Sequence, residues 1–376
     1  ERYGEGGLRI KNKKYKNPLF SIITVVYNGE KYIGNCLNSV LAQDFKKPIE
    51  ILMIDDASND NSIEEIKKYN ILFLNLHSLS LNRGPSAARN LGIKNAKGKY
   101  IFMMDVDDNI TADTFSILYN AAEKDDCDLV FSDFKRIENF KNQRENIFSY
   151  SSDLFFKNKK ILKTMIEEIY NHNPLFAQFG IMGCNSRLIK RSVLQNNKVL
   201  FIEELRFFDD KVFGWSVLAF VQKVKYVRKQ LYSYHVRPGE DSGCTSAINH
   251  GFPVNNFKLV KHHIQKSLRL RGLDENEVKK YGDQALIFYI ISLLISYSRS
   301  MFLGKVDIIK GKDNRRKIIK EIINNREIIK AASNYIPSKQ ESSWIPKAIS
   351  LRSLFLIETA CNIRARSTIK NRRKGV

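Results

Sequence analysis

The chain has 376 residues, of which 43% are hydrophobic, so it is long enough to bury one large core or two. Its formal net charge of +22 predicts affinity for an acidic partner, such as a phosphorylated substrate, an anionic membrane or a nucleic acid. Its five cysteines are scattered without a Cys-x-x-Cys pair, which argues against a disulfide framework and favours a reducing compartment.

Residues 1–17 are rich in Gly, Lys and Asn and are expected to form an N-terminal arm, without the basic region and apolar core of a signal peptide. Apolar strands then alternate with amphipathic helices. Strands are expected at 19–26, 50–54, 71–75, 100–104 and 128–134, and helices at 30–43, from a capping box at Ser62–Glu65, at 86–95 and at 111–124. This alternation predicts an α/β fold with a mostly parallel sheet and helices on both faces.

Polar residues follow three of these strands, at the edge where parallel α/β sheets bind ligands. They are Tyr27 and Asn28, then Asp55 and Asp56, then Asp105, Asp107 and Asp108. Clustered carboxylates repel one another, and a divalent cation such as Mg²⁺ or Mn²⁺ is the commonest reason to bring them together. Since such sites also use substrate phosphates, the last cluster indicates a nucleotide substrate. The alternative is a solvated acidic turn.

Four motifs, in the right order, resemble those of family 2 glycosyltransferases. They lie at 21–33, 54–62, 82–93 and 104–108, and the last is similar to the family's Asp-x-Asp motif. Ala57 replaces a glycine that is usual in the second motif. The resemblance covers residues 19–110. It implies the Rossmann-like GT-A fold, a nucleotide-sugar donor that is usually a UDP-sugar, and Mn²⁺ or Mg²⁺ as the cofactor.

Carried over by position, the resemblance implies two groups of donor-side residues. The nucleotide-sugar-binding group comprises Thr24, Tyr27, Asn28, Asp55, Asp56, Asn82, Arg83, Arg89 and Asp105. The metal-binding group comprises Asp105, Asp107 and His235. Plainer roles stay open: Arg89 as a helix-surface arginine, Asp56 as a helix N-cap and His235 as a structural residue.

The family's inverting reaction needs a base that deprotonates the acceptor hydroxyl. Residues 205–213 resemble the family's catalytic pair, which makes Asp210 the base and Asp209 its neighbour, in place of the usual Glu. Three aromatic residues are expected to wall the pair and raise a carboxylate pKa: Phe207, Phe208 and Phe213. Glu203–Glu204 is a competing pair, and a plain carboxylate pair at a helix start is the alternative reading.

Residues 180–190 resemble the family's acceptor side, and residues 232–242 resemble a later Tyr-x-Tyr element. These segments supply the acceptor-side candidates Cys184, Asn185 and Arg237. Neither Trp215 nor Trp344 stands in the Gln-x-x-Arg-Trp motif of the family's processive members, so a non-processive transferase is expected.

Beyond residue 250 the pattern is helical, and residues 301–376 hold 18 Lys or Arg against 6 Asp or Glu. The longest apolar segment, 285–297, is shorter than the roughly 18 residues of a membrane span and is expected to be a buried helix. Residues 345–363 interleave apolar residues with Lys347 and Arg352, which predicts an interfacial helix with a polybasic end on an anionic membrane. The alternatives are a core helix with a solvated basic end and a nucleic-acid-binding tail, although no nucleic-acid module is recognisable.

The expected domains are the arm at 1–17, a GT-A catalytic domain at 18–250 and a helical basic region at 251–376. Within the catalytic domain, 18–135 would bind the nucleotide-sugar and 136–250 would form the acceptor side. The leading hypothesis is an inverting, metal-dependent glycosyltransferase of bacterial surface polysaccharide biosynthesis. It would act in the cytoplasm, or peripherally on the inner face of the membrane, on a glycan or lipid-linked acceptor and without a nucleic-acid partner. The alternatives are a nucleotidyltransferase acting on a sugar phosphate and a basic nucleic-acid-binding protein.

Overall fold

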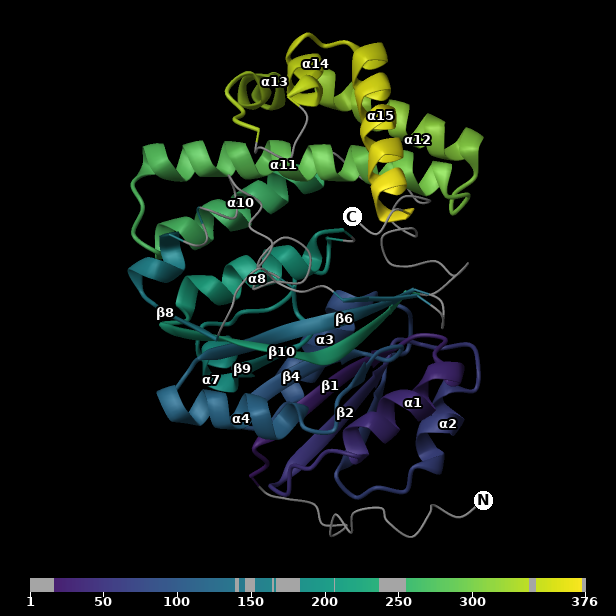
Figure 1. Cartoon of the computed structure of the whole chain (residues 1–376), viewed down its shortest axis with the longest axis vertical. Helices are drawn as coiled ribbons and strands as arrows, with labels where there is room; N and C mark the ends of the chain where they lie inside the picture. Colours follow the sequence, from purple (N-terminus) through teal and green to yellow (C-terminus); the bar gives the residue numbers. More distant parts are fainter. Residues whose placement is uncertain are drawn as a thin grey trace. The chain divides into compact units, whose positions relative to one another are not determined.

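A computed structural model describes residues 17–138, 142–145, 153–163, 166, 183–205, 207–236, 255–337 and 343–373 (Figure 1). The chain forms two compact units. Among the described residues, the sheet unit comprises 17–161, 183–203 and 209–236, and the helical unit comprises 162, 163, 166 and 204–208 together with 255–373. The domain division expected at residue 250 stays a prediction.

The first four strands of the sheet unit are parallel and lie in the order β3-β2-β1-β4. Their bounds are Phe20–Val26 for β1, Ile49–Asp55 for β2, Leu74–Ser78 for β3 and Tyr100–Asp105 for β4. The connecting helices are α1 at Glu30–Leu41, α2 at Ser62–Lys68 and α3 at Pro85–Asn95. In the register, Val26 pairs with Asp55 and Val25 with Asp105, so the carboxyl ends of β2 and β4 flank that of β1, as expected from the sequence.

The other half of the sheet is mixed. After β4 come β5 at Asn109–Ile110, α4 at Thr114–Asp125, β6 at Leu129–Glu138, β7 at Asn142–Glu145, β8 at Leu154–Lys157, β9 at Arg187–Lys190, α7 at Arg191–Asn196, α8 at Asp209–Phe220 and β10 at Lys223–Val236. The strand β9 runs antiparallel between β4 and β6, and β10 lies parallel to β6. This arrangement brings β10 to the same part of the sheet as the end of β4.

Both faces of the first four strands are covered by helices. On one face, the Phe20 ring lies 4.8 Å from Phe45 and 5.2 Å from Phe115 of α4, measured between ring centroids. On the other face, α3 lies so close to β1 that a Cβ on Gly92 would stand 2.4 Å from the Ile23 side chain. Glycine is therefore required there by close approach.

Three expected boundaries are wrong. Ser62 is not an N-cap but the first residue of α2, because its hydroxyl bonds Asp60 and accepts from the Gly29 amide at 2.8 Å. The strand expected at 71–75 is β3 at Leu74–Ser78, since residues before it form turns. The helix expected from residue 111 begins at Thr114, because Asn109–Ile110 pairs with β10.

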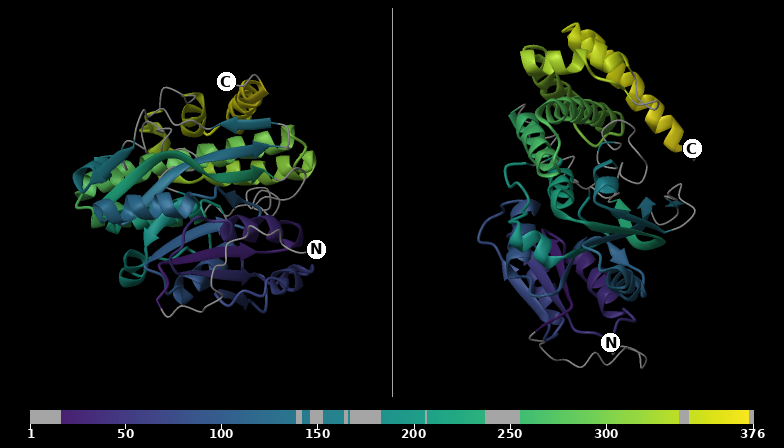
Figure 2. Two further views of the ribbon diagram at one scale, coloured as in Figure 1. Left: turned by 60° about the horizontal axis from the view of Figure 1, so that its bottom comes forward. Right: turned by 90° about the vertical axis from the view of Figure 1, so that its left-hand side faces the viewer.

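The helical unit is built around α11, Glu275–Phe302. The other helices are α10 at Asn255–Leu270, α12 at Ile308–Ile323, α13 at Arg326–Ser333, α14 at Trp344–Ser350 and α15 at Leu354–Arg373. By length and composition α11 is apolar enough to cross a membrane, yet most of its apolar stretch is buried among its neighbours, as expected for 285–297. Figure 2 shows α15, in yellow, along the outside of the green helices.

The single helix expected at 345–363 is wrong. The structure has two helices, α14 and α15, with a turn at Leu351–Ser353 in which Arg352 has a φ of 55°. Four of the apolar residues expected to face a membrane are instead buried inside the helical unit: Ile345, Ala348, Ile349 and Ile357.

Candidate active site

Three carboxylates lie together at the end of β4, where their oxygen atoms are within 4.8 Å of one another (Asp105, Asp107 and Asp108). Asp108 is buried, and both of its oxygens accept hydrogen bonds, one from the Tyr232 hydroxyl and the other from the His235 amide at 2.8 Å. Burial raises the pKa of Asp108 well above its usual range, and the charges of the two other carboxylates add to this. Asp108 therefore joins β4 to β10 and is buried, whereas Asp105 and Asp107 are partly exposed and are the carboxylates that a cation can reach.

His235 lies beside Asp107. Burial lowers the pKa of His235, against the opposing charge of Asp107, and favours the neutral imidazole that metals bind. Its Nδ1 atom is buried and accepts or donates no hydrogen bond within the part of the chain that the structure describes. Two carboxylates and an orphaned imidazole nitrogen form a donor set that suits Mn²⁺, so these residues fit the expected divalent cation.

Arg89 of α3 links the carboxylates of β4 to those of α8. Its guanidinium lies 3.0 Å from Asp105 and 3.4 Å from Asp209, and its side chain is only 12% exposed. Burial alone would lower the pKa of Arg89, but the neighbouring acidic groups outweigh it and raise the pKa. Arg89 is thus a buried cation inside the site rather than a helix-surface arginine.

The predicted catalytic pair occupies the first turn of α8. Asp209 is the inner member: it accepts from the Ser86 hydroxyl at 3.0 Å and from Arg89. Burial raises the pKa of Asp209, the bond to Arg89 opposes this, and the charge of Asp210 adds to it. Asp210 is the outer member, with a side chain 35% exposed and 3.7 Å from the Lys211 ammonium. Of the two, Asp210 is therefore the carboxylate that a substrate can reach.

The aromatic wall expected around this pair is divided between the two units. Phe213 lies in the sheet unit, where its ring stacks on Phe201 at 4.0 Å. Phe207 and Phe208 belong to the helical unit, where Phe208 packs against Tyr289 at 4.6 Å.

The competing pair Glu203–Glu204 is also divided. Glu203, in the sheet unit, accepts from Arg83 at 2.7 Å and from Asn90 at 3.1 Å, whereas Glu204 belongs to the helical unit. The Glu203 carboxylate is fixed by side chains from two distant positions, whereas Asp210 bonds the amide of its own neighbour Lys211 at 2.8 Å, so Asp210 is the less constrained candidate base in the sheet unit.

The loops after β1, β2 and β3 are tied together by side-chain bonds to the backbone. Asp56 accepts from the amides of Arg83 and Gly84, both at 2.8 Å, and so shapes the entry to α3. Asn28, with a φ of 49°, donates its amide to Ser58 at 2.9 Å and accepts from the Asn59 amide at 2.8 Å. The loops therefore form one braced edge.

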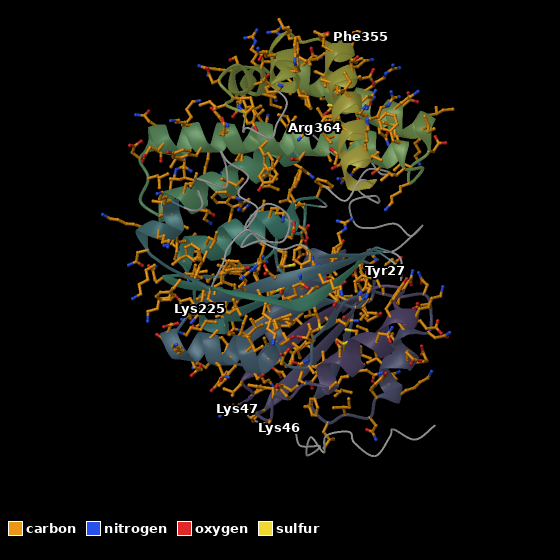
Figure 3. The ribbon with its side chains drawn as sticks, in the orientation of Figure 1. Tyr27, Lys46, Lys47, Lys225, Phe355 and Arg364 are labelled. Atoms are coloured by element: carbon orange, nitrogen blue, oxygen red, sulfur yellow. The ribbon has the colours of Figure 1, made fainter. Side chains whose placement is uncertain are left out.

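Of the remaining donor-side candidates, Asp55 is the most informative. Asp55 is 1% exposed, and its Oδ1 is buried without a hydrogen-bond partner among the described residues, so it is an acceptor poised for a donor. Tyr27 is 43% exposed at the end of β1 (Figure 3), and Asn82 is also exposed. Thr24, in contrast, lies buried within β1, beside Cys36.

The acceptor-side candidates lie closer to the carboxylates than expected. Asn185 donates to Asp105 at 2.8 Å, so it orients a predicted metal ligand. Cys184 is buried and burial raises its pKa to about 12, which makes it a poor nucleophile. Arg237 lies outside the described residues.

Three residues of this site were not among the sequence candidates: Ser86, Arg187 and Tyr232. Arg187 of β9 is 2% exposed, and burial lowers its pKa to about 10, with Asp210 among the charges that oppose this. An arginine directly before the apolar pair Leu188 and Ile189 was the available signal. Ser86 and Tyr232 reach their carboxylates from 123 and 124 residues away, which no local pattern reveals.

Comparisons with known proteins find glycosyltransferases. Residues 21–197 match the protein family described as Glycosyl transferase family 2. EpsJ, an uncharacterized glycosyltransferase of Bacillus subtilis, is 30% identical over 226 residues, which are 59% of this chain and 62% of EpsJ. TarS, the poly(ribitol-phosphate) beta-N-acetylglucosaminyltransferase of Staphylococcus aureus, is 27% identical over 226 residues, 59% of this chain and 36% of TarS. A cholesterol galactosyltransferase of Borreliella burgdorferi is 27% identical over 299 residues, 75% of this chain and 78% of that protein.

The fold has a counterpart among solved structures. TarS 1–349 in complex with UDP-GlcNAc aligns with a TM-score of 0.65 and 21% identity, over 93% of this chain and 92% of that one. The expected α/β GT-A fold with a helical C-terminal region is thereby confirmed. The matched segment spans less than two-thirds of EpsJ and little more than one-third of TarS.

Proposed function

We propose that this chain, whose residues 21–197 match glycosyl transferase family 2, transfers one sugar from a UDP-sugar to an acceptor hydroxyl with inversion at the anomeric carbon. The observation that carries the proposal is the Arg89 bridge, which holds Asp105 of the predicted metal side and Asp209 of the predicted catalytic side around one guanidinium. The two halves of the proposed site would thus be neighbours in one compact unit.

The donor would lie along the braced edge of the sheet. Asp55 offers a buried acceptor to a base or ribose donor, and Tyr27 offers an exposed ring at the end of β1. Asp105, Asp107 and His235 would hold Mn²⁺ or Mg²⁺, which when bound neutralises negative charge on a diphosphate leaving group. Asn185 would keep the Asp105 carboxylate in place.

Asp210 would accept the proton of the acceptor hydroxyl, while the oxygen of that hydroxyl forms a bond to the anomeric carbon. The bond between that carbon and the β-phosphate oxygen breaks at the same time, and UDP leaves with the electron pair. Asp209 would not exchange protons; its bonds to Ser86 and Arg89 would fix the first turn of α8 and with it Asp210.

We propose a bacterial cell-surface polymer or a lipid-linked glycan as the acceptor, and the cytoplasm as the location. TarS supports the first, because its name describes transfer to poly(ribitol-phosphate), and the Borreliella relative supports a lipid acceptor through its name. The sugar would be a hexose or an N-acetylhexosamine, as in the names of these relatives.

Binding and turnover with UDP-glucose, UDP-galactose and UDP-GlcNAc test the proposal. We expect at least one donor to bind with Mn²⁺ and to release UDP, and we expect EDTA to remove both signals. No binding of any UDP-sugar with Mn²⁺ would overturn the proposal. So would pyrophosphate exchange with a nucleoside triphosphate, which is the reaction of a nucleotidyltransferase.

A further inference from the structure

Four large apolar side chains of the helical unit point outward from α14, α15 and the turn between them. Trp344 is 71% exposed, Leu351 69%, Phe355 72% and Ile363 65%. Figure 3 labels Phe355 near the start of α15 and Arg364 further along the same helix. Single exposed apolar residues are ordinary on a protein surface, but a row of them on adjoining elements marks an interaction site.

Helical spacing places these residues on one side of each helix. On α14 and its last turn, Trp344, Lys347 and Leu351 recur at intervals of three and four residues and are exposed, while Ile345 and Ile349 are buried. The chain then turns at Arg352, whose φ is 55°, and the Ser353 amide bonds the Ala348 carbonyl at 3.1 Å. The turn is therefore fixed, and Leu351 and Phe355 stand at the same corner.

The same division holds on α15. Ile357, Cys361 and Ala365 recur every four residues and are fully buried, which marks the side that packs inside the helical unit. Phe355, Ile363 and Arg366 are exposed on the remaining surface. The outward-facing apolar side chains therefore do not contribute to the hydrophobic core of the unit.

Positively charged side chains are exposed on the same helices as these apolar residues. The exposed ones are Lys347, Arg352, Arg366 and Lys370. Glu358 is the only acidic residue between 343 and 376, and it is taken up by ion pairs with Arg315 and Arg316, both at 3.1 Å. The outward residues of this segment are therefore apolar and positive, and the one carboxylate of the segment is already ion-paired.

We propose that this face, made of Trp344, Leu351, Phe355 and Ile363 with their flanking cations, binds the surface of an anionic lipid bilayer. Indole and phenyl rings rest at the depth of lipid headgroups, aliphatic side chains enter the acyl boundary, and Lys and Arg pair with phosphates. A second copy of the chain fits less well, because joining two such faces would bring like charges together. A nucleic acid would satisfy the cations but not Leu351 or Ile363.

The chain carries its own probe for this proposal. It has two tryptophans, and Trp344 is 71% exposed whereas Trp215 is 1% exposed. With vesicles of phosphatidylcholine and roughly 30% phosphatidylglycerol, we expect a blue shift of Trp344 emission and quenching by brominated acyl chains. Vesicles of phosphatidylcholine alone should give a weaker effect, and added salt should weaken the response to anionic vesicles. Trp344→Phe, which leaves only the buried tryptophan, should show no shift.

Matched variants distinguish vesicle binding by this face from non-specific vesicle binding by other parts of the surface. The double variant Leu351→Ser and Phe355→Ser should bind anionic vesicles about tenfold more weakly or worse, and Lys347→Glu with Lys370→Glu should do the same. Leu270→Ser, at a side chain 49% exposed on α10, and Lys266→Glu on the same helix are the controls and should bind as the unchanged chain does. Circular dichroism checks that each variant is folded.

The proposal would be overturned by the absence of a Trp344 shift with anionic vesicles, or by a shift that needs no lipid and follows a concentration-dependent change of mass in light scattering. The second result would assign the face to a second copy of the chain. A shift with single-stranded DNA but not with vesicles would also overturn it. None of these measurements uses sugar transfer, so the outcome is independent of the proposed catalytic function.

Discussion

Arg89 and Asp209 form a largely buried ion pair, with side chains 12% and 17% exposed and 3.4 Å between Nη1 and Oδ2, although they are 120 residues apart in the sequence. The other terminal nitrogen of the same guanidinium lies 3.0 Å from Asp105. One cation therefore balances a carboxylate at the end of β4 and another at the start of α8. This contact helps to hold the first turn of α8, and with it Asp210.

Arg89→Met is expected to lower the free energy of unfolding by about 3 kcal/mol, because it leaves two carboxylates facing each other without their cation. UDP release should fall as well, since α8 loses its anchor. Urea denaturation measures the first effect. Arg83→Met is the control: that side chain is 53% exposed in its pair with Glu203, so the loss should stay below about 1 kcal/mol. Equal losses in the two variants would contradict the role given to Arg89.

The convergence of polar strand ends was predictable from the sequence. Strand and helix patterns at 19–105 repeat with short connections, and parallel topology then brings Asp55 and Asp105 to the two sides of β1. The partners of those residues were not predictable. Asn185 reaches Asp105 across 80 residues, and Tyr232 reaches Asp108 across 124, and no local spacing encodes such contacts.

The C-terminal helices show a second limit. The pattern at 345–363 indicates amphipathic helix, but it does not say which apolar residues meet other helices. Ile349 and Ile357 turned out to be core, whereas Leu351 and Phe355 are exposed. The difference comes from the turn at Arg352, whose left-handed backbone no apolar pattern signals.

Replacing Asp107 should affect metal-dependent binding, whereas replacing Asp108 should affect stability. Asp107→Ala is expected to abolish Mn²⁺-dependent UDP binding in calorimetric titration and to leave the free energy of unfolding nearly unchanged. Asp108→Ala should lower that free energy by about 1–3 kcal/mol, because the buried Tyr232 O–H and the His235 amide lose their common acceptor. Asp108→Asn should be milder, since its carbonyl still accepts from His235. If Asp107→Ala kept its metal dependence, Asp107 would not be a ligand.

Asp210→Asn should reduce sugar transfer by roughly a hundredfold or more while leaving the affinity for UDP unchanged, because an amide accepts no proton from the attacking hydroxyl. Initial rates and UDP titration give the two quantities. Glu203→Gln is the matched control in the same unit, and its carboxylate is already engaged by Arg83 and Asn90. Transfer that survives in Asp210→Asn but disappears in Glu203→Gln would move the base to Glu203.

Ala57→Gly should stabilise the protein. Ala57 has a φ of 59°, a left-handed conformation that costs an L residue with a Cβ about 1–2 kcal/mol and costs glycine nothing. Glycine also gives the unfolded chain more conformational entropy, which offsets part of this relief, so the free energy of unfolding should rise by about 0.5–1 kcal/mol. Thermal and urea unfolding measure it. Ala121→Gly, in the middle of α4, is the control and should lose about 1 kcal/mol. A loss in both variants would show that Ala57 is not strained.

The ionisation of Asp133 should lower the free energy of unfolding as the pH rises. It is a buried carboxyl of β6 whose two oxygens both accept from the Tyr226 hydroxyl at 2.8 Å, and burial raises its pKa to about 6. An unfolded chain releases this proton near pH 4, so the folded protein holds more protons between pH 4 and 6. Its stabilising contribution is therefore complete below pH 4 and lost by the time the pH exceeds 6.

Asp133→Asn removes this titration and keeps a carbonyl for Tyr226. We expect the variant to match the unchanged protein near pH 4 and to exceed it by about 2 kcal/mol at neutral pH, because the Asn side chain mimics the protonated acid. Urea denaturation at several pH values measures the difference, in which all other titrating groups cancel. Asp125→Asn supplies the opposite sign: the bond to Lys225 lowers the pKa of Asp125, so its replacement should cost stability at neutral pH. A constant difference between Asp133→Asn and the unchanged protein across this range would show that Asp133 titrates as an ordinary carboxyl.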